Sequence, residues 1–374
     1  SGRFIPRPLF FMNYIHKKGD FCYNKPIKTR GNDNMISFLN DYSQTAHDKV
    51  LSRLIEAGTR SYPGYGLDER SLRAARLIKK LIKQDADIHF MPGGTSCNKT
   101  VIAHALKPFE AVIAVKSGHI NVHETGAVEA SGHKILQIEG RDGKATPGEI
   151  IKILETHNNE HMVVPKMVYI SNSTETGTIY AKAELEEIAK LCRENGMFLF
   201  LDGARLGAAL TAAKNDLTLA DIALLTDAFY IGGTKNGAML GEAVVITNDK
   251  LKAGFRHSMK LNGAMLAKGF VVGMQFEALF EDGLFFRLAE KANQAAMKLR
   301  DGLLNRGIKF RYPVETNQIF VAFPAHIVDS LSRKYLFEIW EEVKDGAVIR
   351  LVTSWATKTN EIDAFLTDLD TVNK

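Results

Sequence analysis

The fold class is indicated most clearly by Met197-Phe198-Leu199-Phe200-Leu201-Asp202-Gly203-Ala204-Arg205. The first five residues are all apolar, and an acidic residue follows them directly. A strand that is apolar at every position is buried on both faces, which is typical of a parallel sheet covered by helices. The segment therefore predicts a buried strand that ends at Asp202.

The same alternation extends in both directions along the chain. Short unbroken apolar runs recur at residues 111–115, 167–170 and 243–246. Between them, residues 74–81 and 185–192 carry apolar side chains at the i, i+3, i+4, i+7 spacing of amphipathic helices. We therefore predict an α/β fold with a mostly parallel sheet covered by helices.

The C-terminal part has a different pattern. A long helical stretch is expected over residues 263–304, followed by strand-like segments and further helices, which indicates a smaller α+β domain. A chain of 374 residues is also longer than a single core usually grows. We expect an N-terminal extension and arm (1–50), a large domain (51–262) and a small C-terminal domain (263–374).

The charge distribution argues against a nucleic-acid partner. The formal net charge is +5, and residues 1–34 alone hold seven basic and two acidic side chains, which also gives +5. The rest of the chain is therefore neutral and lacks a basic footprint. No apolar run approaches the roughly 20 residues that cross a bilayer, so we expect no membrane partner. We interpret the basic opening segment as an arm without a catalytic role.

The cysteines Cys22, Cys97 and Cys192 are odd in number and widely spaced, which does not fit a disulfide framework. A reducing compartment fits best, so we expect a cytoplasmic protein, although the basic opening segment leaves organellar targeting open. Cys97 lies in a Gly-rich turn but is not surrounded by a known nucleophile signature.

Polar residues follow several predicted strands at their carboxyl ends, where ligands bind in such sheets. They include Asn172, Asp202, and Lys235 in the turn Gly232-Gly233-Thr234-Lys235-Asn236-Gly237. A lysine beyond one strand and a carboxylate beyond another can serve pyridoxal phosphate, one as the Schiff base and the other as partner of the pyridine nitrogen. A plain exposed lysine in a turn is the simpler interpretation of Lys235 alone.

Three further groups support a cofactor site. The turn Gly93-Gly94-Thr95-Ser96 precedes a helix, so its backbone amides suit a phosphate, although it could be an ordinary helix cap. His119 can stack on a pyridine ring; alternatively it is a structural histidine, or it binds a metal with His123 and a third ligand, either His133 or Glu124. Asp202 needs a cationic partner if buried, and either a protonated pyridine nitrogen or Arg205 could provide it.

These motifs occur in the order seen in threonine aldolases, and from about Met35 to its C-terminus the chain resembles the threonine aldolase and β-eliminating lyase family. That family consists of pyridoxal phosphate enzymes of fold type I. The resemblance depends on this ordered set: Asn40-Asp41-Tyr42-Ser43, Tyr65-Gly66-Leu67-Asp68, Gly94-Thr95-Ser96-Cys97-Asn98, His119 with Glu124, Asp202-Gly203-Ala204-Arg205, Thr234-Lys235 and Arg350-Leu351-Val352-Thr353.

The resemblance implies that pyridoxal 5'-phosphate is the cofactor and that no metal is needed. It implies these cofactor-binding residues: Gly94, Thr95, Ser96, His119, Asp202, Arg205, Thr234 and Lys235. It implies these substrate-binding residues: Ser43, Tyr65, Arg205 and Arg350. In the family the segment around Tyr65 reaches an active site shared between subunits, so a homodimer or homotetramer is implied. The partner's phosphate-binding residues align poorly here, and the candidates are Arg256, Lys260 and Lys268.

The implied reaction cleaves the Cα–Cβ bond of a β-hydroxy amino acid, converting threonine or allo-threonine to glycine and acetaldehyde. Candidate bases for the β-hydroxyl proton are His119, His123 and Glu175. Glu175 stands where many threonine aldolases have a second active-site histidine, which leaves the substrate open. The alternatives are β-elimination, cleavage of another amino acid, or a catalytically silent binding protein of the same fold.

Overall fold

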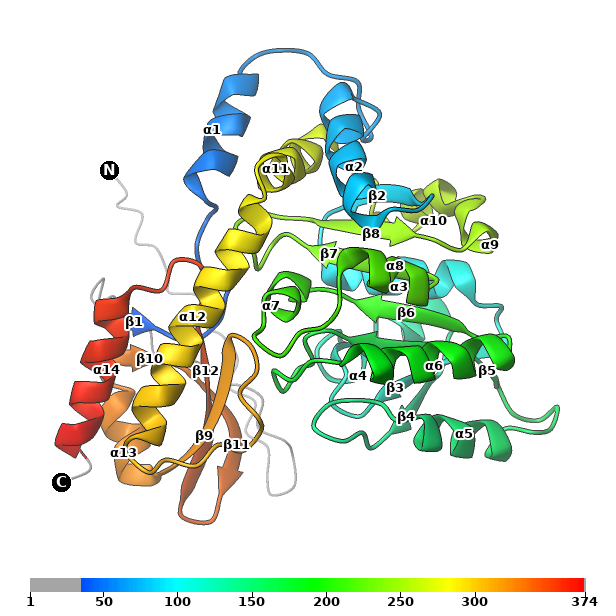
Figure 1. Ribbon diagram of the computed structural model, residues 1–374. Helices are drawn as coiled ribbons and strands as arrows, with labels where there is room; N and C mark the ends of the chain where they lie inside the picture. The colour runs from blue at the N-terminus through cyan, green and yellow to red at the C-terminus, as the bar shows by residue number, and fades with distance from the viewer. Residues whose placement is uncertain (1–34, 373–374) are drawn as a thin grey trace, which may run out of the picture. The chain divides into compact units, whose positions relative to one another are not determined.

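The computed structural model describes residues 35–372, and the unit that begins at Ile36 contains all of its helices and strands (Figure 1). The expectations for residues 1–34, including Cys22, lie outside the described residues. The helices are α1 (Asp48–Ala57), α2 (Glu69–Ile82), α3 (Gly94–Ala105), α4 (His119–Val122), α5 (Pro147–Thr156), α6 (Lys182–Glu194), α7 (Leu206–Leu210), α8 (Leu219–Leu225), α9 (Asp249–Lys252), α10 (Phe255–Leu261), α11 (Phe270–Glu281), α12 (Leu284–Leu304), α13 (Ala325–Leu331) and α14 (Thr359–Val372).

A seven-stranded sheet forms the centre of the larger part, in the order β2-β8-β7-β6-β5-β3-β4. The five strands from β7 to β4 are parallel, whereas β8 runs antiparallel to both of its neighbours. The prediction of a mostly parallel sheet is therefore confirmed. The strands are β2 (Asp87–Met91), β3 (Glu110–Val115), β4 (Ile135–Ile138), β5 (Val164–Ser171), β6 (Phe198–Asp202), β7 (Ala228–Gly232) and β8 (Glu242–Ile246).

Helices cover both faces of this sheet, which explains why its strands are apolar at consecutive positions. In β3, Ala111 and Ile113 belong to the core shared with α2, α6, α8 and α11. Val112 and Ala114 belong to a second core on the opposite face, with α3 and α10. Because successive side chains of a strand point to opposite faces, each strand contributes to both cores.

The helical stretch predicted over residues 263–304 proves to be two helices. α11 ends at Glu281 and α12 begins at Leu284, and Gly283 between them has a φ of 67°. That left-handed conformation cannot continue an α-helix and is readily adopted by glycine. Residues 263–269 form turns ahead of α11.

A second, smaller sheet lies in the C-terminal part, as the sequence predicts (Figure 1). Its antiparallel order is β11-β12-β9, and it packs with α12, α13 and α14 around Leu299, Val321 and Phe365. A two-residue parallel pair, β1 with β10, adjoins it. The strands are β1 (Ile36–Ser37), β9 (Gln318–Pro324), β10 (Tyr335–Leu336), β11 (Glu338–Val343) and β12 (Gly346–Val352). The domain boundaries stay predictions.

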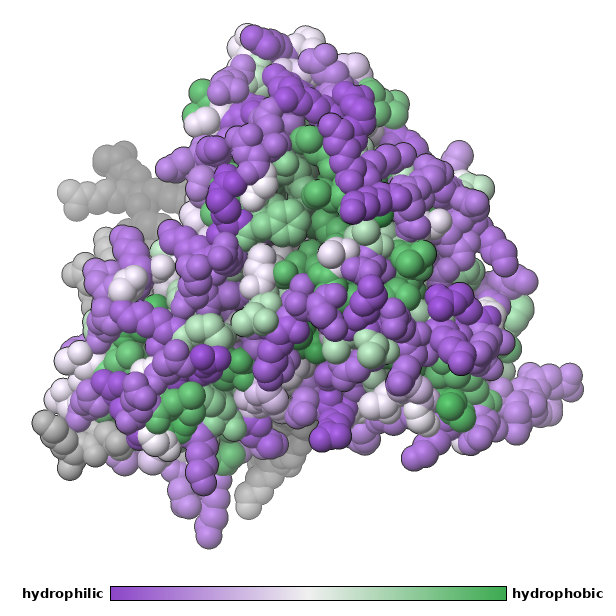
Figure 2. Space-filling model, in the orientation of Figure 1, coloured by the Kyte–Doolittle hydropathy of each residue, from purple (hydrophilic) through white to green (hydrophobic). Residues whose placement is uncertain are grey.

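Hydrophilic residues cover most of the face seen in Figure 2, and apolar residues reach the surface mainly at its centre, near the upper half of α12. Among the described residues, the helices are either too short or too polar to span a bilayer.

Candidate active site

The ends of two neighbouring parallel strands, β6 and β7, bring two of the predicted residues to one rim of the sheet. Asp202 is the last residue of β6, and Lys235 follows β7 by three residues. The turns after these strands pack backbone against backbone. A Cβ at Gly203 would lie 1.8 Å from the Tyr230 carbonyl oxygen, and one at Gly232 would lie 2.3 Å from the Ala204 carbonyl oxygen. Glycine is therefore required at both turns for this close approach.

The Asp202 carboxylate is 3% exposed and accepts four hydrogen bonds. Oδ1 accepts from the Tyr230 hydroxyl at 2.5 Å and from the Ala204 amide at 2.9 Å. Oδ2 accepts from the Tyr169 hydroxyl at 2.5 Å and from Asn98 Nδ2 at 3.0 Å. A buried carboxylate is tolerated because these donors replace the lost water.

Electrostatics keep this buried acid ionised. Burial by itself would raise the pKa of Asp202, but the charge of His119 and the hydroxyls of Tyr169 and Tyr230 outweigh it, so the pKa lies below its usual value. The ion pair between Asp202 and Arg205, considered as an alternative from the sequence, does not form among these contacts. Arg205 binds a different acid.

Arg205 donates from Nε to Asp41 Oδ2 at 2.7 Å and from Nη2 to Asp41 Oδ1 at 3.0 Å. Asn317 Nδ2 also donates to Oδ2, at 2.9 Å. Burial would raise the pKa of Asp41, but the charges of Arg205 and Lys235 hold it below its usual value. The guanidinium group of Arg205, which was expected to bind a substrate carboxylate, therefore already binds the carboxylate of Asp41. Its Nη1 takes no part in this pair.

His119 begins α4, and its Nδ1 lies 2.7 Å from Oε1 of Glu124, a carboxylate that can only accept when ionised. If Glu124 is ionised, this contact assigns the proton to Nδ1, and it fixes the imidazole orientation. Glu175 Oε1 accepts from the backbone amide of His119 at 3.0 Å and from Ser171 Oγ at 2.7 Å. Burial raises the pKa of Glu175, and its Oε2 has no hydrogen-bond partner.

His123 follows His119 by one helical turn, and the ring centroids are 5.4 Å apart. Desolvation and the positive charges of His119, Arg350 and Lys235 lower the pKa of His123 to about 4, so the imidazole is neutral at pH 7. The metal alternative is not supported, because His133 Nδ1 bonds to the Glu110 carbonyl. No cluster suited to a metal occurs within residues 35–372.

Lys235 is half-buried, and its Nζ lies 6.0 Å from the ring centroid of Tyr42. Burial and the charge of Arg205 lower the pKa of Lys235 to about 8. A second acid supports the lysine turn: Glu242 accepts from Thr234 Oγ1 at 2.9 Å and from the amide of Gly233 at 2.8 Å. Burial raises the pKa of Glu242 to about 7.

The predicted phosphate turn opens α3, which begins at Gly94 without a side-chain cap. Ser96 Oγ donates to the carbonyl of Gly93 at 2.7 Å, whereas Thr95 is exposed. A Cβ at Gly94 would lie 3.0 Å from the Tyr230 hydroxyl, so glycine keeps the helix start close to the Asp202 network. The first amides of a helix attract anions.

Arg350, on β12, pairs with Glu338 on the neighbouring strand and lies 5.6 Å from the Trp340 ring centroid. Its Nε is buried without a hydrogen-bond partner. Desolvation and the charge of Arg205 lower the pKa of Arg350. Ser43 is exposed and donates to Asn40 Oδ1 at 2.8 Å.

Tyr65 lies elsewhere, beside α10. Its side chain is exposed, Lys260 Nζ lies 5.3 Å from its ring centroid, and Arg256 donates to its carbonyl oxygen at 3.1 Å. Lys268 is exposed as well. Tyr65 and two of the three candidate phosphate-binding residues thus form a surface cluster.

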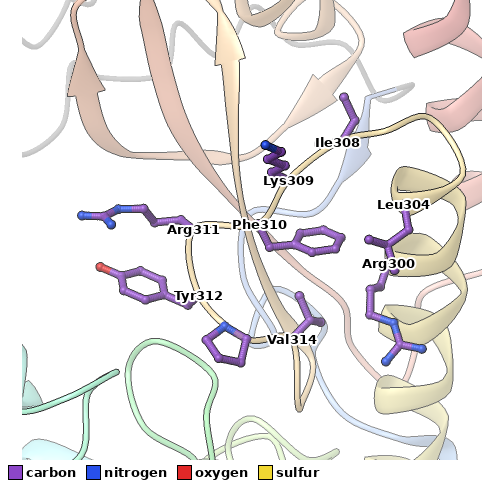
Figure 3. Close-up of a pocket in the computed structure, with 9 residues that line it drawn as sticks. Arg300, Leu304, Ile308, Lys309, Phe310, Arg311, Tyr312 and Val314 are labelled. Atoms are coloured by element: carbon purple, nitrogen blue, oxygen red, sulfur yellow. The ribbon is translucent and has the colours of Figure 1, made fainter.

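A surface cavity of about 610 Å³ lies between the end of α12 and residues 308–314 (Figure 3). Arg300 and Leu304 reach it from α12, opposite Phe310 and Val314. None of the predicted site residues lines this cavity, so it is separate from the lysine site.

Comparison with known proteins decides the family. The family model described as Beta-eliminating lyase matches residues 50–325, which is more than half of the chain. The chain belongs to the beta-eliminating lyase family. It is therefore a pyridoxal-phosphate-dependent lyase, as the sequence motifs implied.

Individual relatives of this lyase carry more detailed names. A low specificity L-threonine aldolase of Pseudomonas sp. is 30% identical over 82% of this chain and 89% of the relative. A solved structure of Leishmania major threonine aldolase is 47% identical and covers 91% of this chain and 100% of that chain, with a TM-score of 0.90. The aspartate aminotransferase of Thermus thermophilus is 16% identical at a TM-score of 0.68, covering 91% and 92%, and shares the fold alone. The predicted fold type I is confirmed.

The residues of the lyase fit pyridoxal phosphate. The amine of Lys235 has a lowered pKa, the buried Asp202 is kept ionised, and α3 presents uncapped amides. Several buried polar atoms near these groups have no partner, including Glu175 Oε2 and Glu124 Oε2. Such atoms are rare in a folded protein unless a ligand or water meets them.

Sequence reasoning assigned no role to several residues of the lyase site. Tyr169 and Tyr230 lie in apolar strands, where an aromatic side chain is ordinarily part of the core. Asn98 was noted only as part of a motif, although it lies one helical turn after Gly94. Glu242 directly precedes the predicted apolar run 243–246, and an acid at the start of a buried strand was the available signal.

Proposed function

We propose that this lyase cleaves the Cα–Cβ bond of threonine or allo-threonine and releases glycine and acetaldehyde. The observation that carries the proposal is the neutral imidazole of His123, beside His119 and within the electrostatic influence of Lys235. A retro-aldol cleavage needs a base that takes the β-hydroxyl proton. The names of the Pseudomonas and Leishmania major relatives support the same reaction.

The other residues would hold the cofactor and the substrate. Lys235 would carry pyridoxal phosphate, Asp202 would accept from its ring nitrogen, and His119 would lie against the ring. When bound, the cofactor supplies an electron sink for the pair left at Cα. Arg350 would bind the substrate carboxylate, because its buried Nε lacks a partner. Ser43 is a second candidate for that contact.

Of the three candidates, His123 is the one we infer to take the β-hydroxyl proton, because it is neutral at pH 7 and lies beside His119. His119 uses Nδ1 to reach Glu124. Glu175 uses Oε1 for Ser171 and for the amide of His119, and burial raises its pKa. A neutral imidazole can act as the base for such a proton.

We also propose that the lyase acts as a homodimer or homotetramer with shared active sites. The surface cluster of Tyr65, Arg256 and Lys260 supports this, because its positive charge suits the cofactor phosphate of a second subunit. The molar mass in solution tests it. The buried free thiols of Cys97 and Cys192 fit a reducing compartment, and the cytoplasm is the proposed location.

A substrate panel tests the reaction. L-threonine, L-allo-threonine, D-threonine, phenylserine and serine are incubated with the loaded enzyme, and aldehyde, glycine, pyruvate and ammonia are measured. Equal amounts of acetaldehyde and glycine from threonine support the proposal. Pyruvate and ammonia from serine, without acetaldehyde from threonine, would instead establish β-elimination. No product from the loaded enzyme would favour a silent binding protein.

The base is tested with His123→Phe. Cleavage of threonine should fall by about 10²- to 10⁴-fold, whereas exchange of the α-hydrogens of glycine, which needs no β-hydroxyl base, should persist. His133→Phe is the matched control, because His133 contacts Glu110 outside the site. Normal cleavage by His123→Phe would remove His123 from this role.

A further inference from the structure

Asn98 connects two buried acids that are far apart in the sequence. Its side chain is 0% exposed, and Nδ2 donates to Glu124 Oε1 at 2.7 Å and to Asp202 Oδ2 at 3.0 Å. The two hydrogens of one amide group thus serve two carboxylates. Its Oδ1 has no hydrogen-bond partner, so the amide is held mainly through its donors.

The same Oε1 of Glu124 accepts from His119 Nδ1 at 2.7 Å. A continuous path of hydrogen bonds therefore leads from His119 through Glu124 and Asn98 to Asp202. Its ends are the imidazole proposed to lie against the cofactor ring and the acid proposed to meet the ring nitrogen.

Charge explains why an amide suits the middle of this path. Glu124 and Asp202 are 6% and 3% exposed, so two acidic side chains share a poorly hydrated region. Like charges repel strongly in such surroundings, and donors placed between them reduce the cost. An aspartate at position 98 would add a third acid, and an apolar residue would withdraw both hydrogens.

We propose that Asn98 is a positioning residue that couples His119 to Asp202: through Glu124 it fixes the Nδ1-protonated form of His119, and directly it keeps Asp202 oriented as an acceptor. This inference rests on the proposed roles of His119 and Asp202. It requires nothing about which amino acid is cleaved. Asn98 itself acts only through its two acidic neighbours.

Asn98→Leu tests the proposal because it keeps the approximate shape and removes the donors. In the cofactor-free protein, ¹⁵N chemical shifts of His119 report which ring nitrogen carries the proton. The Nδ1-protonated population should be dominant in the native protein and fall in the variant. The dissociation constant for pyridoxal phosphate should rise about tenfold to a hundredfold, the cost of a lost hydrogen bond to a charged group.

Asn293→Leu is the matched control. Asn293 is also buried, and Nδ2 also makes two bonds, to the Ala208 carbonyl and Thr211 Oγ1, while Oδ1 lacks a partner. The Asn293→Leu protein should be less stable than the native protein, but its His119 tautomer and its affinity for the cofactor should be unchanged. Asn98→Asp, which keeps the side-chain shape, serves as a second variant if Asn98→Leu does not fold, and it should weaken cofactor binding at least as much.

An unchanged tautomer together with a dissociation constant within twofold of the native value, in a folded Asn98 variant, would overturn the proposal and leave Asn98 a packing residue. Both measurements are made without an amino acid. They therefore stay valid if threonine proves not to be the substrate.

Discussion

Arg205 binds Asp41 through two parallel hydrogen bonds of 2.7 and 3.0 Å, although Asp202 is only three residues away in the sequence. The pair is almost fully buried, with side-chain exposures of 11% and 1%. It joins the rim of the large sheet to the segment before α1, and Asn317 ties the same carboxylate to the C-terminal part. Arg205 therefore connects separate segments of the chain at the site, and its positive charge also lowers the pKa values of Asp41 and Lys235.

Asp41→Asn should destabilise the protein by about 3–5 kcal/mol at pH 7, the usual cost of leaving one partner of a buried ion pair alone. The pKa of Asp41 in the folded protein lies below its ordinary value of 3.8, because the charges of Arg205 and Lys235 outweigh the effect of burial. The contribution of the ion pair is therefore present above pH 3.8 and is lost as the pH falls through the folded pKa. Urea unfolding at pH 7 and in steps below pH 4 measures this. Equal stability of variant and native protein at pH 7 would contradict it.

Lys235 should react as an unusually acidic amine. Its pKa of about 8 means that the neutral, nucleophilic form gains population as the pH rises through 8, rather than through the ordinary lysine value of 10.5. Modification of the cofactor-free protein with an acylating reagent, followed by peptide mass spectrometry, should give a rate at Lys235 with a midpoint near pH 8. The exposed Lys190 provides the reference rate. A midpoint above pH 10 would show that burial does not lower the pKa of Lys235.

Glu242→Gln should lower the pH midpoint of Lys235 modification below its native value of about 8. The negative charge of Glu242 raises the pKa of Lys235, so removing it favours the neutral amine. The same modification assay applies, and the Lys190 rate should be unaffected. An upward movement of the Lys235 midpoint would show that Glu242 acts on the turn geometry instead of through its charge.

Arg350→Ala should raise the KM for the amino acid about tenfold to a hundredfold, through the loss of a charged hydrogen bond, with a much smaller change in kcat. Steady-state kinetics separates the two constants. Arg311→Ala is the matched control, because Arg311 also lies over an aromatic ring, Tyr312, and pairs with an acid, Glu341. If both variants behave alike, Arg350 does not bind the substrate.

Glu277→Gln should destabilise the fold by about 3–5 kcal/mol. Glu277 lies in α11, is 0% exposed, and pairs with arginines of α1 and α2 at 2.9 to 3.2 Å: Arg53, Arg70 and Arg73. Guanidinium-induced unfolding measures the loss. Glu281→Gln is the comparison variant and should cost less stability, since Glu281 is 29% exposed. A smaller loss for Glu277→Gln than for Glu281→Gln would be inconsistent with a buried network.

Periodicity in the sequence was enough to predict the sheet and much of its helical cover. Runs such as 197–201 are apolar at every position because helices cover both faces of the sheet, and β3 shows this directly. The break at Gly283 was missed, because a single glycine within an amphipathic pattern is compatible with a continuous helix as well as with two.

The placement of Asp202 and Lys235 after buried strands follows from the order of residues, because parallel strands end at one edge of a sheet. The cofactor was implied by the resemblance of the ordered motifs to a known family. Which charged groups meet was decided by the tertiary structure. Asp41 rather than Asp202 receives Arg205, and two tyrosines and Asn98 surround Asp202. The partners of these hydrogen bonds are separated by between 26 and 164 positions in the sequence. A hydrogen bond forms only when its two atoms lie about 3 Å apart, and the packing of the folded chain determines that distance.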